Sequence, residues 1–266
     1  MNPNCKKRMG AIRLENMKVI SQEEIAPAIF ELVLEGEMVE AMKAGQFLHL
    51  RVPDDAHLLR RPISISSIDK LKKQCHLIYR IEGSGTAIFS SLKSGDSLDV
   101  MGPQGNGFDL SELNNDSKVL LVGGGIGVPP LLEVAKQLHD RGVEITTVLG
   151  FATKDAVILE DELAQYSQVF VTTDDGSYGT QGNVSVVITE CDTEFDAIYS
   201  CGAPGMMKYI NQTFYDHPRA YLSLESRMAC GMGACYACVL KVPDSETVSQ
   251  RVCEDGPVFK TGTVIL

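Results

Sequence analysis

The stretch Lys118-Val-Leu-Leu-Val-Gly-Gly-Gly-Ile-Gly-Val-Pro-Pro130 joins a buried strand, a glycine-rich turn and the start of a helix in one run. Lys118 to Val122 is apolar enough for a strand covered on both faces, and the prolines suit the first turn of a helix that continues to His139. Glycines let a backbone approach a pyrophosphate, and a helix N-terminus favours its charge. Because the turn is not a G-x-G-x-x-G fingerprint, a connection that binds nothing remains an alternative. The candidate binding residues are Gly123, Gly124, Gly125 and Gly127.

Strands and helices alternate after this stretch. Val143 to Leu149, Gln168 to Thr173 and Phe195 to Ser200 are predicted strands, and Asp161 to Ala164 is a short predicted helix. Such alternation indicates a doubly wound parallel sheet.

Two further turns follow strands of this sheet, at the edge where ligands bind. The carboxylates of Asp174 and Asp175 can accept hydrogen bonds from ribose hydroxyls, although Asp-Gly is also a common turn signal. Cys201 and Gly202 open Cys-Gly-Ala-Pro-Gly, which is alternatively a tight turn with a buried cysteine. We therefore expect these four residues to contribute to a nicotinamide dinucleotide site.

Residues from about Ala11 to Val100 contain short alternating or apolar runs bounded by turn residues. Examples are Ile29 to Leu34, Phe47 to Val52 and Cys75 to Ile81. Many short strands without long helices predict a small antiparallel barrel. One short helix is expected to open at Thr86, because Ala87 to Leu92 has helical spacing.

The barrel segment carries two elements suited to a dinucleotide flavin. In Arg60-Arg-Pro-Ile-Ser64, arginine can grip a pyrophosphate and the serine hydroxyl can hydrogen-bond a ring nitrogen. Gly83-Ser-Gly-Thr86 opens the short helix and presents free N–H groups. The alternatives are an edge strand with surface arginines and an ordinary helix cap.

Four cysteines near the C-terminus have the spacing C-x4-C-x2-C-x14-C: Cys230, Cys235, Cys238 and Cys253. This is the plant-type pattern for a [2Fe–2S] cluster, although the last gap is shorter than in plant ferredoxins. Small residues between the first cysteines allow the loop to fold tightly around an inorganic core. A chain with such a cluster is expected to move single electrons.

Other uses of these cysteines stay open from spacing alone. A structural zinc site usually pairs two short knuckles, and a C-x2-C dithiol usually follows a thioredoxin-like context. Disulfides are not expected without a secretory signal.

Composition narrows the class of protein. The chain has 266 residues, 44% hydrophobic and 22% charged, with a net charge of −11, which argues against nucleic-acid binding. Lys6-Lys-Arg8 lacks the apolar stretch of a signal peptide, and no run reaches the length of a membrane span. We expect a cytosolic protein with no membrane partner.

The barrel with R-P-x-S, the glycine-rich nucleotide domain and the Cys-Gly-x-Pro turn together resemble the ferredoxin–NADP reductase superfamily. The added cysteine pattern is similar to the electron-transfer subunits of class 1B dihydroorotate dehydrogenases. The resemblance covers about Met17 to Leu266 and is most specific at Glu225-Ser-Arg-Met-Ala-Cys-Gly-Met-Gly-Ala-Cys-Tyr-Ala-Cys238. The first ten residues look like an extension.

The resemblance implies three parts: an FAD-binding six-stranded barrel at 11–110, an NAD-binding α/β domain at 111–220 and a [2Fe–2S] segment at 221–266. It also implies an FMN-containing catalytic subunit in a heterotetramer of two plus two, acting in pyrimidine biosynthesis. Ser64 is expected near the flavin and Cys201 near the nicotinamide. The full set implied for FAD is Arg61, Pro62, Ile63, Ser64, Ile78, Tyr79, Arg80, Gly85 and Thr86.

Two rival functions remain from the sequence. A stand-alone NAD(P)H reductase would use the same cofactors with another electron acceptor. A zinc-stabilised binding module with a degenerate barrel would use neither flavin nor iron.

Overall fold

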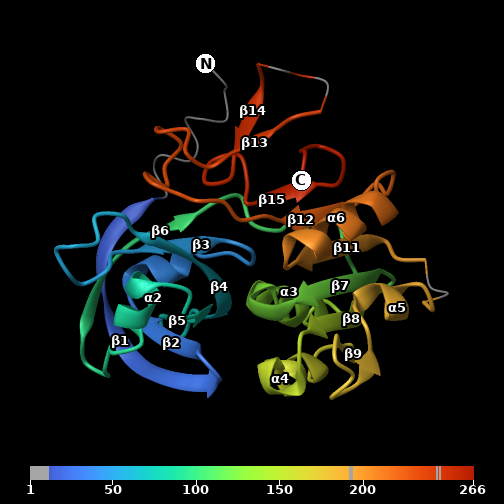
Figure 1. The fold of residues 1–266 in the computed structure, drawn as a ribbon, viewed down its shortest axis with the longest axis horizontal. Coiled ribbons are helices and arrows are strands. Elements are labelled where there is room, and N and C mark those ends of the chain that lie inside the picture. Colours follow the sequence, from blue (N-terminus) through green and yellow to red (C-terminus); the bar gives the residue numbers. More distant parts are fainter. Residues whose placement is uncertain (1–11, 192–193, 244, 246) are drawn as a thin grey trace.

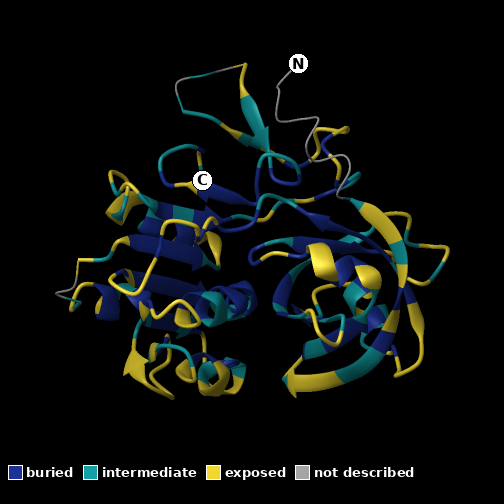
Figure 2. Cartoon of the chain, turned by 180° about the vertical axis from the view of Figure 1, so that it is seen from behind, coloured by how far each residue is buried: buried dark blue, intermediate teal, exposed yellow. Residues whose placement is uncertain are grey.

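The computed structural model describes residues 12–191, 194–243, 245 and 247–266, so the expected N-terminal extension lies outside the described residues. A barrel and an α/β sheet lie side by side, and the C-terminal segment crosses over the top of both (Figure 1). Buried residues are concentrated inside the barrel and in the strands of the sheet (Figure 2).

The first part is a closed barrel of six antiparallel strands in the order β1-β2-β5-β4-β3-β6, which confirms the predicted architecture. Alternate side chains such as Leu32, Leu48, Leu77 and Val100 fill its interior. Its elements are β1 (Arg13–Ala26), β2 (Ile29–Glu35), η1 (Glu37–Ala41), β3 (Phe47–Leu50), β4 (Arg61–Asp69), β5 (Gln74–Arg80), α2 (Ser84–Phe89) and β6 (Ser97–Gln104).

The second part is a seven-stranded sheet in the order β10-β9-β8-β7-β11-β12-β15. All neighbouring strands are parallel except β15, which runs antiparallel to β12. Its elements are β7 (Lys118–Gly124), η2 (Gly125–Gly127), α3 (Pro129–His139), β8 (Glu144–Phe151), η3 (Lys154–Ala156), α4 (Glu160–Ala164), β9 (Gln168–Thr173), β10 (Thr180–Gln181), α5 (Val184–Ile188), β11 (Ala197–Cys201), α6 (Pro204–Thr213), β12 (Ala220–Ser223) and β15 (Val258–Lys260).

Helices cover both faces of this sheet, as a doubly wound fold requires. Val119 and Leu121 of β7 pack with α3 and α4 in one apolar cluster. Leu120 and Val122, which point the other way, pack with α5 and α6 in another. The alternation explains why β7 reads as a continuous apolar run: each face of the strand is buried.

The third part is a loop region with a two-stranded sheet of β13 (Val239–Lys241) and β14 (Ser249–Arg251). Its last strand, β15, joins the large sheet beside β12, and the predicted boundary between residues 220 and 221 falls inside β12. The division into 11–110, 111–220 and 221–266 stays a prediction.

Some boundaries differ from the predictions. Helix α2 begins at Ser84 rather than Thr86, because the Thr86 hydroxyl accepts hydrogen bonds from the amides of Glu82 and Gly83 and caps the turn from within it. Helix α6 was missed, although Pro204 stands in its first turn. Within the described residues, the structure contains no helix with the length and apolarity needed to cross a bilayer.

Candidate functional site

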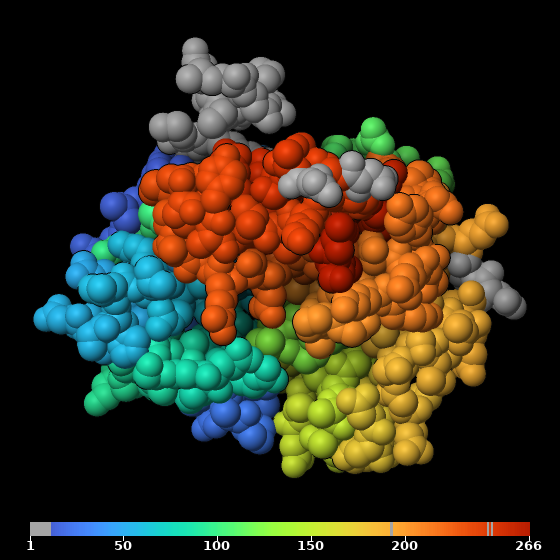
Figure 3. Space-filling model, turned by 45° about the horizontal axis from the view of Figure 1, so that its top comes forward, coloured from blue at the N-terminus to red at the C-terminus, as the bar shows by residue number. Residues whose placement is uncertain are grey.

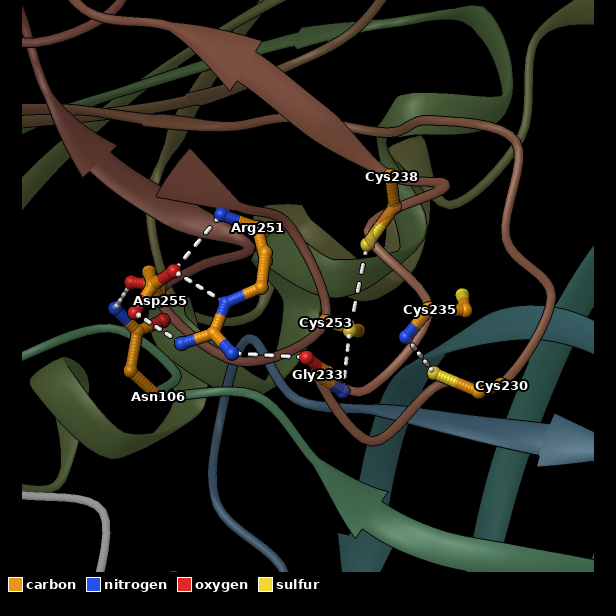
Figure 4. A network of polar contacts seen from close by, with 8 residues as sticks. All are labelled: Asn106, Cys230, Gly233, Cys235, Cys238, Arg251, Cys253 and Asp255. Atoms are coloured by element: carbon orange, nitrogen blue, oxygen red, sulfur yellow. Dashed lines mark hydrogen bonds and ion pairs between the residues drawn. The ribbon is translucent and has the colours of Figure 1, made fainter. Parts of the chain in front are cut away.

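The four predicted cysteines come together beside the loop between β12 and β13. Cys230, Cys235 and Cys238 lie on this loop or at its end, and Cys253 reaches it from the segment after β14 (Figure 4). The Cys238 Sγ atom lies 3.3 Å from the Cys253 Sγ atom. The loop therefore brings thiols from two separate segments into contact.

Backbone amides point at two of these sulfurs. The Gly233 amide donates to Cys253 Sγ over 3.1 Å, and the amides of Met232 and Cys235 each donate to Cys230 Sγ over 3.4 Å. Such N–H···S bonds stabilise thiolate ligands and influence the potential of the metal centre that they hold.

The thiols are arranged as two pairs. The Cys235 amide donates to Cys230 Sγ, and Cys238 Sγ contacts Cys253 Sγ. Each iron of a [2Fe–2S] cluster takes two thiolates, whereas a structural zinc takes four around one ion. Two pairs of neighbouring cysteines match this requirement of a two-iron cluster.

The pKa values of the Cys253 and Cys230 thiols are shifted in opposite directions. Burial raises the pKa of the Cys253 thiol to about 12, and the neighbouring Cys238 adds to this effect. At Cys230 burial acts in the same direction, but the amide hydrogen bonds of Met232 and Cys235 outweigh it and lower the pKa to about 7. Because metals bind the deprotonated thiolate, Cys230 is suited to metal binding at neutral pH, whereas Cys253 would release a proton if it bound a metal.

Arg251 holds the cysteine loop in place from β14. Its Nη1 donates to the Gly233 carbonyl over 2.8 Å, and its Nε donates to Asp255 Oδ2 over 3.1 Å (Figure 4). Its guanidinium also lies 5.2 Å from the centre of the Tyr236 ring. Asn106, which follows the barrel, donates to the Asp255 carbonyl over 3.1 Å. These contacts tie the loop to both β14 and the barrel.

The predicted flavin motif lies on β4, beside the N-terminus of α2. The guanidinium of Arg61 contacts this turn so closely that a Cβ atom on Gly85 would lie 2.7 Å from Arg61 Nε. The structure thus places together the arginine and the helix start that the sequence analysis assigned to one dinucleotide. Pro62 and Ser64 alternate with Ile63 and Ile65, which pack against the barrel core.

Several other side chains predicted to contact FAD are buried or already paired with other protein groups. The Tyr79 side chain is 2% exposed, and its hydroxyl accepts a hydrogen bond from Gln22 Nε2 over 2.7 Å, so only its backbone can reach a ligand. Ile78 is buried in the apolar cluster shared with the sheet. Arg80 is exposed and pairs with Glu82, and the Thr86 hydroxyl serves the α2 cap.

The predicted nicotinamide residues lie along the carboxyl edge of the sheet. Gly123 of β7 is in register with Cys201 of β11, so the two turns that follow these strands are adjacent. A Cβ atom on Gly127 would lie 2.5 Å from the Cys201 carbonyl oxygen, which explains why this turn requires glycine. Burial raises the pKa of the Cys201 thiol to about 12, so the thiol stays neutral at physiological pH.

Asp174 and Asp175 follow β9, which β8 separates from β7 in the sheet. Both side chains are exposed at the same edge. Asp175 Oδ1 accepts hydrogen bonds from the Ser177 hydroxyl over 2.6 Å and from its amide over 3.0 Å, and these bonds lower the pKa of the Asp175 carboxyl. The aspartates thus lie farther from Cys201 than the glycine turn does.

The cysteine region covers the outer face of β3, the strand next to the flavin motif. Phe47 of β3 packs in one apolar cluster with Met228, Cys238 and Cys253. Phe47 is in register with Ser64 of β4, and His49 is in register with Pro62. Neighbouring strands lie about 4.8 Å apart. Figure 3 shows this region spanning the barrel and the sheet.

Three polar residues at this junction were missed by the sequence analysis: Arg251, His49 and Gln104. Arg251 is two residues from Cys253 in the sequence, and this proximity to a candidate ligand could have identified it as a residue that supports the site. His49 is a polar residue inside the apolar run of β3. The alternation of side chains along the strand places His49 on the outside of the barrel, but it cannot show that another segment covers that side.

The chain matches three family models in succession. A model described as the oxidoreductase FAD-binding domain matches residues 12–108, and the oxidoreductase NAD-binding domain matches residues 121–212. The iron–sulfur cluster binding domain of dihydroorotate dehydrogenase B matches residues 225–265.

Curated relatives are similar over nearly the whole chain. The dihydroorotate dehydrogenase B (NAD(+)) electron transfer subunit of Streptococcus pneumoniae strain R6 is 85% identical over 255 residues, which are 96% of this chain and 100% of that protein. The subunit of the same name from Geobacillus kaustophilus is 52% identical, over 95% of this chain and 98% of that protein.

Solved structures share the fold. An NADH-dependent reduced ferredoxin-NADP oxidoreductase superposes with a TM-score of 0.83 and 31% identity, covering 94% of this chain and 90% of that one. A ferredoxin NADP+ reductase from Neisseria gonorrhoeae with bound FAD and NADP gives a TM-score of 0.65 at 16% identity, covering 80% and 94%.

Proposed function

The chain belongs to the family of dihydroorotate dehydrogenase B electron transfer subunits, and from this we propose that it carries electrons from a dihydroorotate-oxidising partner through a [2Fe–2S] cluster and FAD to NAD+. The reaction belongs to de novo UMP biosynthesis. The partner is proposed to hold FMN and to assemble with this chain as two plus two subunits in the cytoplasm.

The order of the cofactors follows from electron counting. A bound FAD can exchange two electrons as a hydride with nicotinamide and single electrons with an iron–sulfur centre, so it must lie between the other two. The protein's task is to bind, orient and shield these groups.

One observation carries this proposal: the cysteine region packs on barrel strand β3, which is the neighbour of the strand that carries the flavin motif. Pro62 and Ser64 of β4 lie beside His49 and Phe47 of β3, and Phe47 packs against the segment that carries Cys238 and Cys253. The flavin motif is therefore one strand spacing, about 4.8 Å, from the strand on which the cysteine region packs.

Individual residues are proposed to divide the binding work. Arg61 and the start of α2 hold the FAD pyrophosphate, and Ser64 presents its hydroxyl to the flavin ring near N5. The glycine turn after β7 receives the dinucleotide, with Asp174 and Asp175 at the ribose. The neutral Cys201 thiol lies beside the nicotinamide.

Anaerobic purification with and without the partner subunit tests the proposal. We expect a protein with flavin bands near 450 nm and broad iron–sulfur absorption that co-purifies with an FMN-containing chain. Cys253→Ser should lose the iron and the broad absorption but keep the flavin bands, whereas Cys191→Ser, outside the cysteine loop, should keep both. A colourless zinc protein would refute the proposal, and a monomer with complete activity would favour the stand-alone reductase.

A further inference from the structure

Two fully buried polar side chains lack a partner in the described structure. His49 is 0% exposed and Gln104 is 1% exposed, yet neither ring nitrogen of His49 and neither amide atom of Gln104 makes a hydrogen bond. These are four of the six buried side-chain polar atoms left without a partner among the described residues. A buried polar group without a partner destabilises the fold, so four such atoms at one place indicate a site that binds a hydrogen-bonding group.

The two side chains lie between the flavin motif and the cysteine loop. His49 on β3 is in register with Pro62 of the flavin motif, and Gln104 at the end of β6 is in register with Phe47. On the other side, a Cβ atom on Gly231 would lie 2.5 Å from His49 Nδ1 and 2.9 Å from Gln104 Oε1. The loop residue next to Cys230 therefore packs directly on this pair.

The imidazole of His49 is suited to hydrogen bonding without charge. Burial, with help from the Arg60 charge, lowers the pKa of His49 to about 4. A neutral imidazole has one donor and one acceptor nitrogen, and the Gln104 amide adds two donors and an acceptor oxygen. The pair thus offers both kinds of group at one place.

Neighbouring protein groups do not satisfy the pair. Arg60 lies close to His49, but its Nη1 donates to the carbonyls of His49 and Asp99 and its Nη2 donates to the Asp99 carboxylate. None of these bonds reaches the imidazole nitrogens of His49. The hydrogen-bond partner of the pair is therefore a bound group or a water molecule between the flavin motif and the cysteine loop.

Resting on the proposed function, we propose that His49 and Gln104 are positioning residues of the flavin–cluster junction. They hydrogen-bond to the flavin ring, directly or through one ordered water, and so set the difference in reduction potential between FAD and the cluster. Neither side chain gains or loses the electron that passes between the two cofactors.

The test uses apolar replacements of similar shape in the complex of this chain with its partner. His49→Phe and Gln104→Leu are compared with His76→Phe, a substitution on β5 at a histidine that pairs with Glu31 on the barrel surface. Flavin and iron contents are measured first. The potentials of FAD and the cluster are then measured by redox titration, followed by visible absorption and by electron paramagnetic resonance.

We expect each variant of the pair to retain both cofactors and to change the equilibrium constant for sharing one electron between them at least tenfold, which is about 59 mV. His76→Phe should change neither potential. His49→Gln, which restores a donor and an acceptor, should recover part of the change. Flavin resonance Raman spectra distinguish a direct hydrogen bond from one through water. Altered hydrogen-bond-sensitive bands in His49→Phe indicate a direct contact with the flavin ring, and unaltered bands indicate a contact through water.

The cofactor content shows whether a negative result refutes the proposed function or only the role of His49 and Gln104. Absence of FAD or of the cluster from the parent protein would refute the proposed function. Unchanged potentials in cofactor-loaded His49→Phe and Gln104→Leu would overturn the role of the pair alone. Should His49→Phe lose FAD, Gln104→Leu, on a different strand, decides the question.

Discussion

At the scale of single residues, Arg251 shows how one side chain can organise a ligand loop without being a ligand. Its guanidinium joins the Gly233 carbonyl, the Asp255 carboxylate and the Tyr236 ring. Gly233 in turn directs its amide to Cys253. Arg251 therefore acts on the cluster through the loop backbone.

We predict that Arg251→Met weakens the cluster site more than it weakens the fold. Charge-assisted hydrogen bonds contribute about 1.5–3 kcal/mol, and 1.4 kcal/mol corresponds to a factor of ten. Iron release to a chelator should therefore become about tenfold faster or more. The loss of visible absorption with time measures this.

Arg13→Met is the matched control, because Arg13 is exposed at the start of β1 in the barrel. It should release iron at the parent rate. Equal iron-release rates for the Arg251→Met and parent proteins would contradict the proposed role of Arg251 in supporting the loop.

At the scale of elements, the cysteine loop is shaped by backbone conformation as much as by its thiols. Gly231 and Gly233 have φ values of +68° and +78°, in the left-handed region that side chains disfavour. Gly231 also lies against His49 with no room for a Cβ atom. The loop thus needs glycine for two independent reasons at one position.

Gly231→Ala is therefore expected to disturb the loop. The left-handed conformation costs about 1–2 kcal/mol for a non-glycine residue, and the contact with His49 adds to it. Iron content after purification should fall, while FAD content should be maintained, because β4 and α2 are untouched.

Gly205→Ala on α6 serves as the comparison, since a Cβ atom there meets nothing within 4 Å. It should keep both cofactors. A Gly231→Ala protein with full iron content and unchanged iron release would show that the loop tolerates a side chain at this position.

At the scale of the whole molecule, a buried carboxylate links the barrel to the α/β sheet. Glu133 of α3 is 4% exposed and accepts hydrogen bonds from the Ile68 amide of β4 over 2.9 Å and from Gln137 Nε2 over 2.7 Å. Ile29, Ile78 and Phe108 pack in the same apolar cluster as α3. This contact fixes β4, which carries the flavin motif, relative to α3 and the adjacent α/β sheet.

Glu133→Ala should lower the free energy of unfolding by about 1–3 kcal/mol, because it leaves the buried Ile68 amide unpaired. Glu133→Gln should cost less, since its amide oxygen can still accept that bond. Urea denaturation measures both. Glu162→Ala, at an exposed position of α4, should leave stability nearly unchanged; an equal loss there would argue against a specific role for Glu133.

The features of the site that the sequence predicts are those encoded by motifs and by residues close together along the chain. Cysteine spacing identified the four thiols, and the glycine turn after Val122 identified the edge of the sheet where a dinucleotide is expected. The alternation within β3 and β4 gave a barrel. The glycine turn and the strand alternation depend on residues only a few positions apart, so turn chemistry and periodicity are sufficient for them, and the cysteines form a known motif of fixed spacing.

The structure alone decided which of these features meet. Strand pairing joins Phe47 to Ser64 and β15 to β12, across 17 residues or more of chain, and no local pattern specifies such partners. It also decided that the Tyr79 side chain points into the barrel and that His49 and Gln104 lie beneath Gly231. The sequence by itself determined the kinds of element and indicated four candidate cysteine ligands, because both follow from the order and spacing of residues along the chain. Their juxtaposition came only from packing, because contacts between distant segments depend on how the whole core is buried.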